Sequence, residues 1–122
     1  MTEKLQILIV DDDEMTTQSL VDIMTLKGFQ AIAAGSGNEG LEVARQRKID
    51  VLLTDVKMPD MNGVELYLQV RETHSDVTAL LMTAYAADEI INKGVEEGIS
   101  FVFAKPLDIE LLLDVFEACQ DS

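Results

Sequence analysis

The 122-residue sequence has little of what marks secreted, membrane or nucleic-acid-binding proteins. Its single cysteine, Cys119, excludes an intramolecular disulfide and suits a reducing compartment. No apolar run approaches the ~20 residues that a membrane-spanning helix needs. Basic residues are also scarce, since 9 Lys and Arg stand against 23 Asp and Glu, for a net charge of -14. This balance argues against direct binding to nucleic acid, where Lys and Arg supply most of the affinity.

The N-terminus does not resemble a targeting segment. Lys4 and one short apolar segment precede three aspartates, which is too little for a signal peptide. We therefore expect a cytoplasmic protein. The length fits a single domain over residues 1–122, and 48% hydrophobic with 26% charged residues is ordinary for a globular fold. The negative charge is compatible with a metal ion, a basic protein partner or solubility alone, and does not choose among them.

Apolar runs alternate with helical patterns along the whole chain. The expected strands cover residues 5–10, 29–34, 49–54, 77–82 and 101–104. The expected helices cover 14–27, 36–47, a segment from 62 or 63, 87–97, and a segment after 108. Strands that are apolar on both faces and alternate with helices predict a three-layer, doubly wound α/β fold with a parallel sheet. Alternation does not determine the strand order, but right-handed crossovers leave few orders.

Several residues have the pattern of helix caps. Asp13 is expected to cap the first helix rather than bind a ligand. Ser36, with Glu39 three residues later, has the spacing of a capping box at the second helix. Asn62 and Asp108 are expected to cap the third and fifth helices.

Polar side chains follow the carboxyl ends of four expected strands. The first strand ends at Asp11 and Asp12, the third at Asp55, the fourth at Thr83 and the fifth at Lys105. Ligands of an open doubly wound sheet bind beyond these ends, at the point where the strand order reverses. With the order 2-1-3-4-5, the first and third strands are neighbours there, and the three aspartates converge.

Three converging carboxylates repel one another and imply a bound cation. Oxygen ligands without a nearby His or Cys fit a hard divalent ion, above all Mg²⁺. Lys105 adds a second positive charge and Thr83 a hydroxyl, so the group forms a receptor for an anion with several oxygens, most obviously a phosphoryl group. Beside such a receptor, Asp55 can act as a nucleophile and form an acyl phosphate. Taken alone, it fits a turn equally well.

Four motifs together strongly resemble the receiver domains of response regulators. They are Ile7-Leu8-Ile9-Val10-Asp11-Asp12-Asp13, Asp55 with Met58-Pro59-Asp60-Met61-Asn62-Gly63, Met82-Thr83-Ala84, and Lys105-Pro106. Their order and spacing match the family over essentially the whole chain. The resemblance implies a flavodoxin-like, five-stranded parallel sheet in the order 2-1-3-4-5. It also implies a chemotaxis-regulator-like phosphoprotein that acts as a switch in bacterial two-component systems, not as a multiple-turnover enzyme.

The resemblance implies a role for each acidic site residue. Asp55 would accept the phosphoryl group of a histidine kinase's phosphohistidine and would share in binding the metal. Asp12 would bind Mg²⁺ directly, and Asp11 would help through bound water. The backbone carbonyl of Lys57 is similar to the family's third protein ligand.

On the phosphoryl side, the resemblance implies that Thr83 hydrogen-bonds the phosphoryl oxygens and that Lys105 pairs with them. The Lys105-Pro106 bond is expected to be cis, as in the family. The side chains of Lys57 and Tyr85 occupy positions that border the phosphoryl group, and we expect them to influence dephosphorylation.

The implied partners are a histidine kinase or phosphotransfer protein and a downstream output domain or protein. The output surface would comprise the fourth helix, fifth strand and fifth helix, where Leu111 and Ala118 lie off the inner stripe. A phosphorylation-dependent homodimer is compatible with the resemblance, whereas direct binding of this domain to nucleic acid or a membrane is not expected. The sequence fits either a stand-alone receiver or the N-terminal piece of a longer protein.

The sequence departs from the family pattern at Val102, where the family usually has a switching Tyr or Phe. Phe101 and Phe103 flank this position, but strand alternation points them to the opposite face. Either a smaller motion serves in this chain, or another side chain reports the phosphorylated state.

Three other functions fit parts of the sequence. Residues 35–40 fit the G-x-G-x-x-G fingerprint of dinucleotide-binding domains, but they follow the strand expected at the sheet edge and leave the aspartates unexplained. A small aspartyl-phosphate phosphatase or phosphotransferase would use the same nucleophile and metal, yet normally has a second acid where this chain has Lys57. A purely structural binding module does not account for the clustered carboxylates.

Overall fold

The computed structural model describes residues 4–84 and 89–121, in which strands and helices alternate. The strands are β1 (Gln6–Val10), β2 (Gln30–Ala34), β3 (Val51–Asp55), β4 (Thr78–Thr83) and β5 (Phe101–Ala104). The helices are α1 (Glu14–Leu26), α2 (Gly37–Gln46), α3 (Gly63–Thr73), α4 (Glu89–Glu97) and α5 (Ile109–Gln120). The described part of the chain contains no helix long and apolar enough to cross a membrane.

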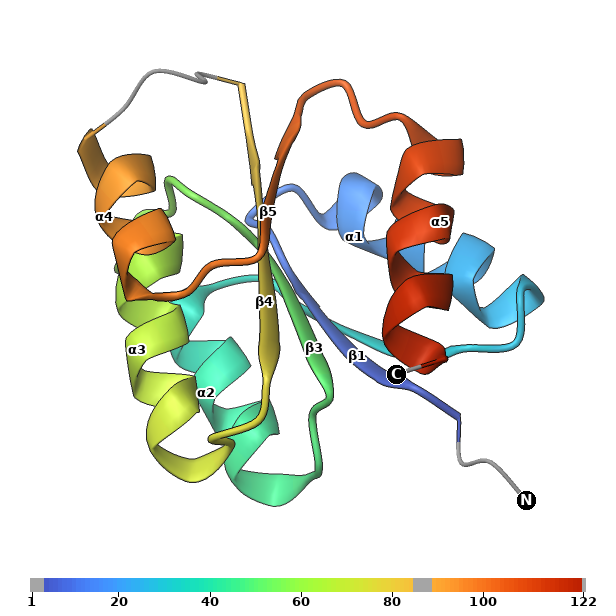
Figure 1. The fold of residues 1–122 in the computed structure, drawn as a ribbon, viewed down its shortest axis with the longest axis horizontal. Coiled ribbons are helices and arrows are strands. Elements are labelled where there is room, and N and C mark those ends of the chain that lie inside the picture. Colours follow the sequence, from blue (N-terminus) through green and yellow to red (C-terminus); the bar gives the residue numbers. More distant parts are fainter. Residues whose placement is uncertain (1–3, 85–88, 122) are drawn as a thin grey trace.

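All five strands pair in parallel in the order β2-β1-β3-β4-β5, with helices on both faces of the sheet (Figure 1). The predicted three-layer α/β fold and its strand order are confirmed. The expected boundaries lie within two residues of the observed ones, except that residues 87 and 88 of the expected fourth helix lie outside the described residues.

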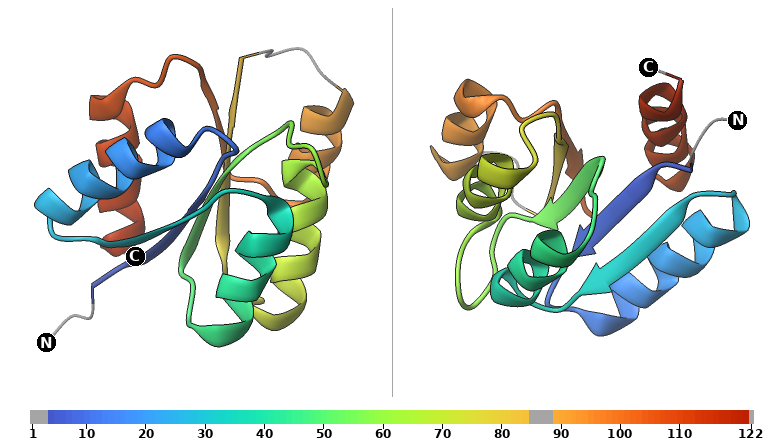
Figure 2. Two further views of the ribbon diagram at one scale, coloured as in Figure 1. Left: turned by 180° about the vertical axis from the view of Figure 1, so that it is seen from behind. Right: turned by 90° about the horizontal axis from the view of Figure 1, so that it is seen from below.

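The sheet separates two apolar cores. Leu8 and Leu52 belong to the core that α2, α3 and α4 cover, whereas Ile9 and Leu53 belong to the core that α1 and α5 cover (Figure 2). Successive strand residues thus enter opposite cores, and these four side chains have no exposed surface. Burial on both faces is the arrangement that continuous apolar strands predict.

Side-chain caps begin most helices as predicted. The Asp13 carboxylate accepts from the backbone N–H groups two and three residues later, and Asp108 accepts from the N–H three residues later. Asn62 and Glu65 form a reciprocal capping box at the start of α3. The helices that follow β1, β3 and β5 therefore begin at positions set by local sequence.

The capping box predicted for α2 is wrong in one half. Ser36 Oγ accepts from the backbone N–H of Glu39 at 3.1 Å, as expected. The Glu39 carboxylate, however, accepts from the backbone N–H of Gly35 at 3.1 Å and not from that of Ser36. The acid still satisfies a backbone donor, but one residue earlier in the chain.

Helix α4 is fastened to α3 at its C-terminal end by three residues, which we call the α3–α4 clasp: Tyr67, Arg71 and Glu97. The Arg71 guanidinium donates to the Glu97 carbonyl oxygen at 2.8 Å and to its carboxylate at 3.1 Å. The Tyr67 hydroxyl donates to the same carbonyl oxygen at 3.1 Å, and Arg71 lies 5.1 Å from the Tyr67 ring centroid. The buried residues of α4 itself are Ile91 and Gly94.

Gly63 allows α3 to begin directly against the end of β3. Its backbone N–H donates to the Val56 carbonyl oxygen at 2.8 Å. A Cβ at this position would overlap the Asp55 carbonyl oxygen and would lie 3.0 Å from Cγ2 of Thr54. The close approach of α3 to the strand end therefore requires glycine.

We expect Gly63→Ala to lower the free energy of unfolding by about 1–3 kcal/mol, because the added methyl group must displace the backbone at Asp55. Gly35→Ala is the matched control, since a Cβ there meets only the Glu39 carboxylate at 3.5 Å, an ordinary contact. Urea denaturation of both variants and the wild type measures the difference. Equal stability of the two variants would contradict this account of Gly63.

Candidate functional site

The carboxyl ends of β1 and β3 lie side by side. The register pairs Val10 with Thr54, so the next residues, Asp11 and Asp55, follow at the same level. One carboxylate oxygen each from Asp11, Asp12 and Asp55 lies within 4.8 Å of the others. Asp11 is only 1% exposed and Asp12 lies at the surface. The predicted convergence of the three aspartates is confirmed.

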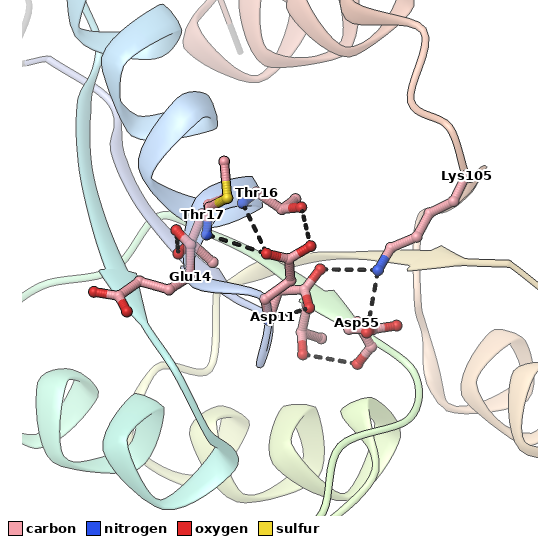
Figure 3. Close-up of polar contacts among 9 residues, drawn as sticks. Asp11, Glu14, Thr16, Thr17, Asp55 and Lys105 are labelled. Atoms are coloured by element: carbon pink, nitrogen blue, oxygen red, sulfur yellow. Dashed lines mark hydrogen bonds and ion pairs between the residues drawn. The ribbon is translucent and has the colours of Figure 1, made fainter.

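Lys105 reaches into this carboxylate cluster from the loop after β5 (Figure 3). Its Nζ donates to Oδ2 of Asp11 at 2.8 Å and to Oδ2 of Asp55 at 3.2 Å. Its backbone N–H donates to the Thr83 carbonyl oxygen at 2.8 Å, which holds the end of β5 against β4. The bond between Lys105 and Pro106 is cis, as expected.

This geometry shifts the pKa values of Asp55 and Lys105. Burial raises the pKa of Asp55 above its ordinary value, and the negative charge of Asp11 raises it further, while Lys105 acts in the opposite direction. Partial burial acts to lower the pKa of Lys105, but its hydrogen bonds and ion pairs with Asp11 and Asp55 outweigh this and raise it. The site therefore combines a firmly charged lysine with an aspartate that is less acidic than usual.

The other residues singled out from sequence lie around this pair. Thr83 ends β4, is 4% exposed, and directly follows Met82, the register partner of Asp55. Lys57 lies in the loop after β3, where it pairs with Asn62 in an isolated antiparallel bridge. Tyr85 lies outside the described residues.

Asp13 stays outside the carboxylate cluster, as predicted. Its carboxylate caps α1, and its backbone N–H donates to Oδ1 of Asp11 at 3.0 Å. The start of α1 thus helps to orient the buried aspartate. Hydrogen bonds from Thr16 keep the pKa of Asp13 below its ordinary value.

The donor set of the carboxylate cluster fits a hard divalent cation. Octahedral Mg²⁺ places its oxygen ligands about 2.1 Å away, so neighbouring ligand atoms lie about 3 Å apart and opposite ones about 4.2 Å apart. One carboxylate oxygen each from Asp11, Asp12 and Asp55 lies within 4.8 Å of the others, which is close to the span of opposite ligands around such an ion. The remaining ligands of such an ion would be a backbone carbonyl and water.

A contact of Asp60, in the loop between β3 and α3, was not predicted from the sequence. The Asp60 carboxylate accepts from the backbone N–H groups of Gly37 at 3.1 Å and of Asn38 at 2.8 Å. It therefore occupies the N-terminus of α2, where a dinucleotide would need to place its pyrophosphate. The fingerprint over residues 35–40 is a helix start next to the edge strand β2, and nothing supports the dinucleotide alternative.

The sequence model of the response regulator receiver domain matches residues 7–117. The chain belongs to this family. It is similar to a response regulator receiver protein of Anaeromyxobacter sp. (strain Fw109-5), with 35% identity over 108 residues that cover 88% of this chain and 45% of the relative. It is also similar to sporulation initiation phosphotransferase F of Bacillus subtilis (strain 168), with 32% identity over 114 residues that cover 93% of this chain and 90% of the relative.

Among solved structures, this receiver domain is similar to a CheY-like receiver domain protein from Methanospirillum hungatei JF-1. The TM-score is 0.91 at 28% identity, over 98% of this chain and 95% of that one. The chain spans less than half the length of the Anaeromyxobacter relative. As a receiver domain, it is a phosphorylation-dependent signalling switch, and nothing favours the phosphatase alternative.

We expect Asp55→Asn to raise stability at neutral pH, because the raised pKa means that folding disfavours the ionised carboxylate. The native state holds this proton more tightly than the unfolded chain does. The contribution of Asp55 to the stability of the fold therefore falls as the pH rises from the ordinary pKa of a carboxyl group through the raised pKa of Asp55, and it stays low above that pKa. In Asp55→Asn this fall should be absent.

Melting temperatures from about pH 4 to pH 8 measure the difference between variant and wild type. Asp13→Asn is the isosteric control, and its expected effect on stability is opposite to that of Asp55→Asn. Because the pKa of Asp13 is lowered, its ionised form stabilises the fold, and the variant should lose stability at neutral pH. A lower melting temperature of Asp55→Asn at neutral pH would disprove the assignment of Asp55 as the disfavoured charge.

Proposed function

We propose that Asp55 is the phosphoacceptor of this receiver domain and that Asp11, Asp12, Asp55 and the Lys57 carbonyl hold the Mg²⁺ ion that assists it. The observation that supports this most directly is the position of the Asp55 carboxylate. It shares one cluster with two further carboxylates and lies 3.2 Å from the Lys105 ammonium group. A nucleophile next to a metal site and a fixed positive charge is the arrangement that phosphoryl transfer needs.

In this proposal, an oxygen of the Asp55 carboxylate forms a bond to phosphorus while the phosphorus–nitrogen bond of a phosphohistidine breaks. The electron pair of the broken bond remains on the imidazole nitrogen of the donor. Mg²⁺, when bound, supplies positive charge that offsets the charge on the phosphoryl oxygens. Lys105 exchanges its contact with Asp55 for the new phosphoryl oxygens, and the Thr83 hydroxyl donates a hydrogen bond to them.

The added dianion then biases a conformational equilibrium of the domain. The donor is a histidine kinase or phosphotransfer protein in the cytoplasm, and the recipient of the signal is an output domain or partner protein. We propose that α4, β5 and α5 form the output surface. Support comes from one exposed large hydrophobic side chain on each of them, namely Val95, Phe101 and Leu111. The same surface is suited to a phosphorylation-dependent homodimer.

The proposal also covers the extent of the domain and the question of whether it acts as a multiple-turnover enzyme. The chain over residues 1–122 is a single receiver domain, which transfers a phosphoryl group to itself and loses it slowly. It is not a multiple-turnover enzyme. The presence of Lys57 two residues after Asp55, in place of a second acid, supports this distinction.

Incubation with Mg²⁺ and a small-molecule phosphodonor should add one phosphoryl group, detectable by mass spectrometry of the intact protein. Asp55→Asn should abolish the adduct, and Lys105→Ala should slow its formation by about 10²-fold, the scale of losing one fixed charge at a transition state. Asp13→Asn is the control, because this carboxylate caps α1 outside the cluster and its loss should leave phosphorylation intact.

An adduct that still forms in the Asp55→Asn variant would disprove the proposal. Release of many equivalents of phosphate per protein would favour a phosphatase instead. Omission of Mg²⁺, or addition of a chelator, should suppress formation of the adduct in the wild type.

A further inference from the structure

The side chain of Asp60 ties the β3–α3 loop to α2, a helix that carries none of the proposed site residues. Its two oxygens accept separately from the backbone N–H groups of Gly37 and Asn38, in the first turn of α2. Such N–H groups have no partner within a helix, and a carboxylate at this end also interacts favourably with the helix dipole. The hydrogen bonds from Asn38 and Gly37 hold the pKa of Asp60 below its ordinary value, so the carboxylate remains charged.

The next residue reinforces the attachment. The Met61 side chain lies directly against Gly37, where a Cβ would overlap it. Gly37 therefore allows the loop to approach α2 closely, and its N–H reaches Asp60 at the same place. Asp60 and Met61 together form the tip of the loop, and both are fixed to the start of α2.

The base of the same loop adjoins the phosphoryl site. Lys57 and Asn62 pair in an antiparallel bridge, and the Gly63 N–H donates to the Val56 carbonyl oxygen at 2.8 Å. These pairings close residues 57–62 into a compact loop whose base begins two residues after Asp55. The loop tip and the peptide group of Lys57 thus belong to one short, closed loop.

We propose that Asp60 is a positioning residue for the metal site. By holding the loop against α2, it keeps the Lys57 carbonyl in the orientation that binds the ion together with Asp11, Asp12 and Asp55. The inference rests on the proposed function, which assigns that carbonyl to Mg²⁺. Asp60 touches neither the ion nor the phosphoryl group, because both of its oxygens are directed to α2.

The chain offers a matched pair of variants for the test. Asp60→Ala and Ser36→Ala each remove a side-chain acceptor from the first turn of α2, since Ser36 Oγ accepts from the Glu39 N–H at 3.1 Å. Only Asp60 belongs to the β3–α3 loop. A purely structural role at the helix start predicts similar effects of both variants, whereas a positioning role predicts different ones.

Isothermal titration calorimetry with MgCl₂ on the unphosphorylated protein measures the affinity directly, and urea denaturation measures stability. Both variants should lower stability. Asp60→Ala should weaken Mg²⁺ binding about tenfold, the scale on which residues behind a metal ligand act, while Ser36→Ala should bind like the wild type. Asp60→Asn keeps one acceptor oxygen and should fall between, and it keeps the test decisive if the alanine variant does not fold.

Two results would overturn the inference: unchanged Mg²⁺ affinity in both Asp60 variants, or equal weakening by Ser36→Ala. Failure of the wild type to bind Mg²⁺ is a separate outcome. It would remove the metal site of the proposed function itself, and with it the role of Asp60. The two failures are therefore distinguishable within one set of titrations.

Discussion

The Lys105 ammonium group lies between the carboxylates of Asp11 and Asp55, and the acidic end of the sheet depends on it. In a chain with a net charge of -14, converging carboxylates repel one another, and burial adds a desolvation cost. Lys105 is separated from Asp11 by 94 residues and from Asp55 by 50. The two ion pairs therefore form only when β1, β3 and β5 have assembled, which links the charge balance of the site to completion of the sheet.

The same lysine connects the site to the edge of the sheet. Lys105 directly follows β5, and its N–H is fixed to the Thr83 carbonyl oxygen. On β5, Val102 packs in the core under α2, α3 and α4, whereas Phe103 packs in the core under α1 and α5. Phe101 lies beside Phe103, with 4.6 Å between the ring centroids. The rings of β5 thus lie on the face of the sheet opposite to α4, as strand alternation predicts, whereas α4 packs into its core through Ile91 and is joined to α3 by the α3–α4 clasp.

The strands and helices could be read from the sequence because they follow from local and periodic signals, whereas the strand order that makes β1 and β3 neighbours was implied by the resemblance to receiver domains. Apolar runs such as 5–10 predicted strands, and the register of parallel neighbours then brought Asp11 next to Asp55. Asp60 could not be found in this way, since its partners lie 22 and 23 residues earlier and no capping motif spans that distance. The partner predicted for Glu39 was wrong by one residue for a related reason. The sequence spacing identifies the Glu39 carboxylate as an available acceptor. The path of the backbone before α2 decides which N–H group donates to it.

The attachment of the β3–α3 loop to Gly37 has a consequence for protein engineering. The loop and the first turn of α2 pack together as one unit, although the rest of α2 and strand β3 lie between them in the chain. A chimera that takes only residues 56–62 from a relative would bring a foreign loop tip to a helix start shaped for Asp60 and Met61. Functional grafts between receivers should therefore exchange both segments together. The unit to be exchanged is defined by contacts in space and not by one continuous stretch of sequence.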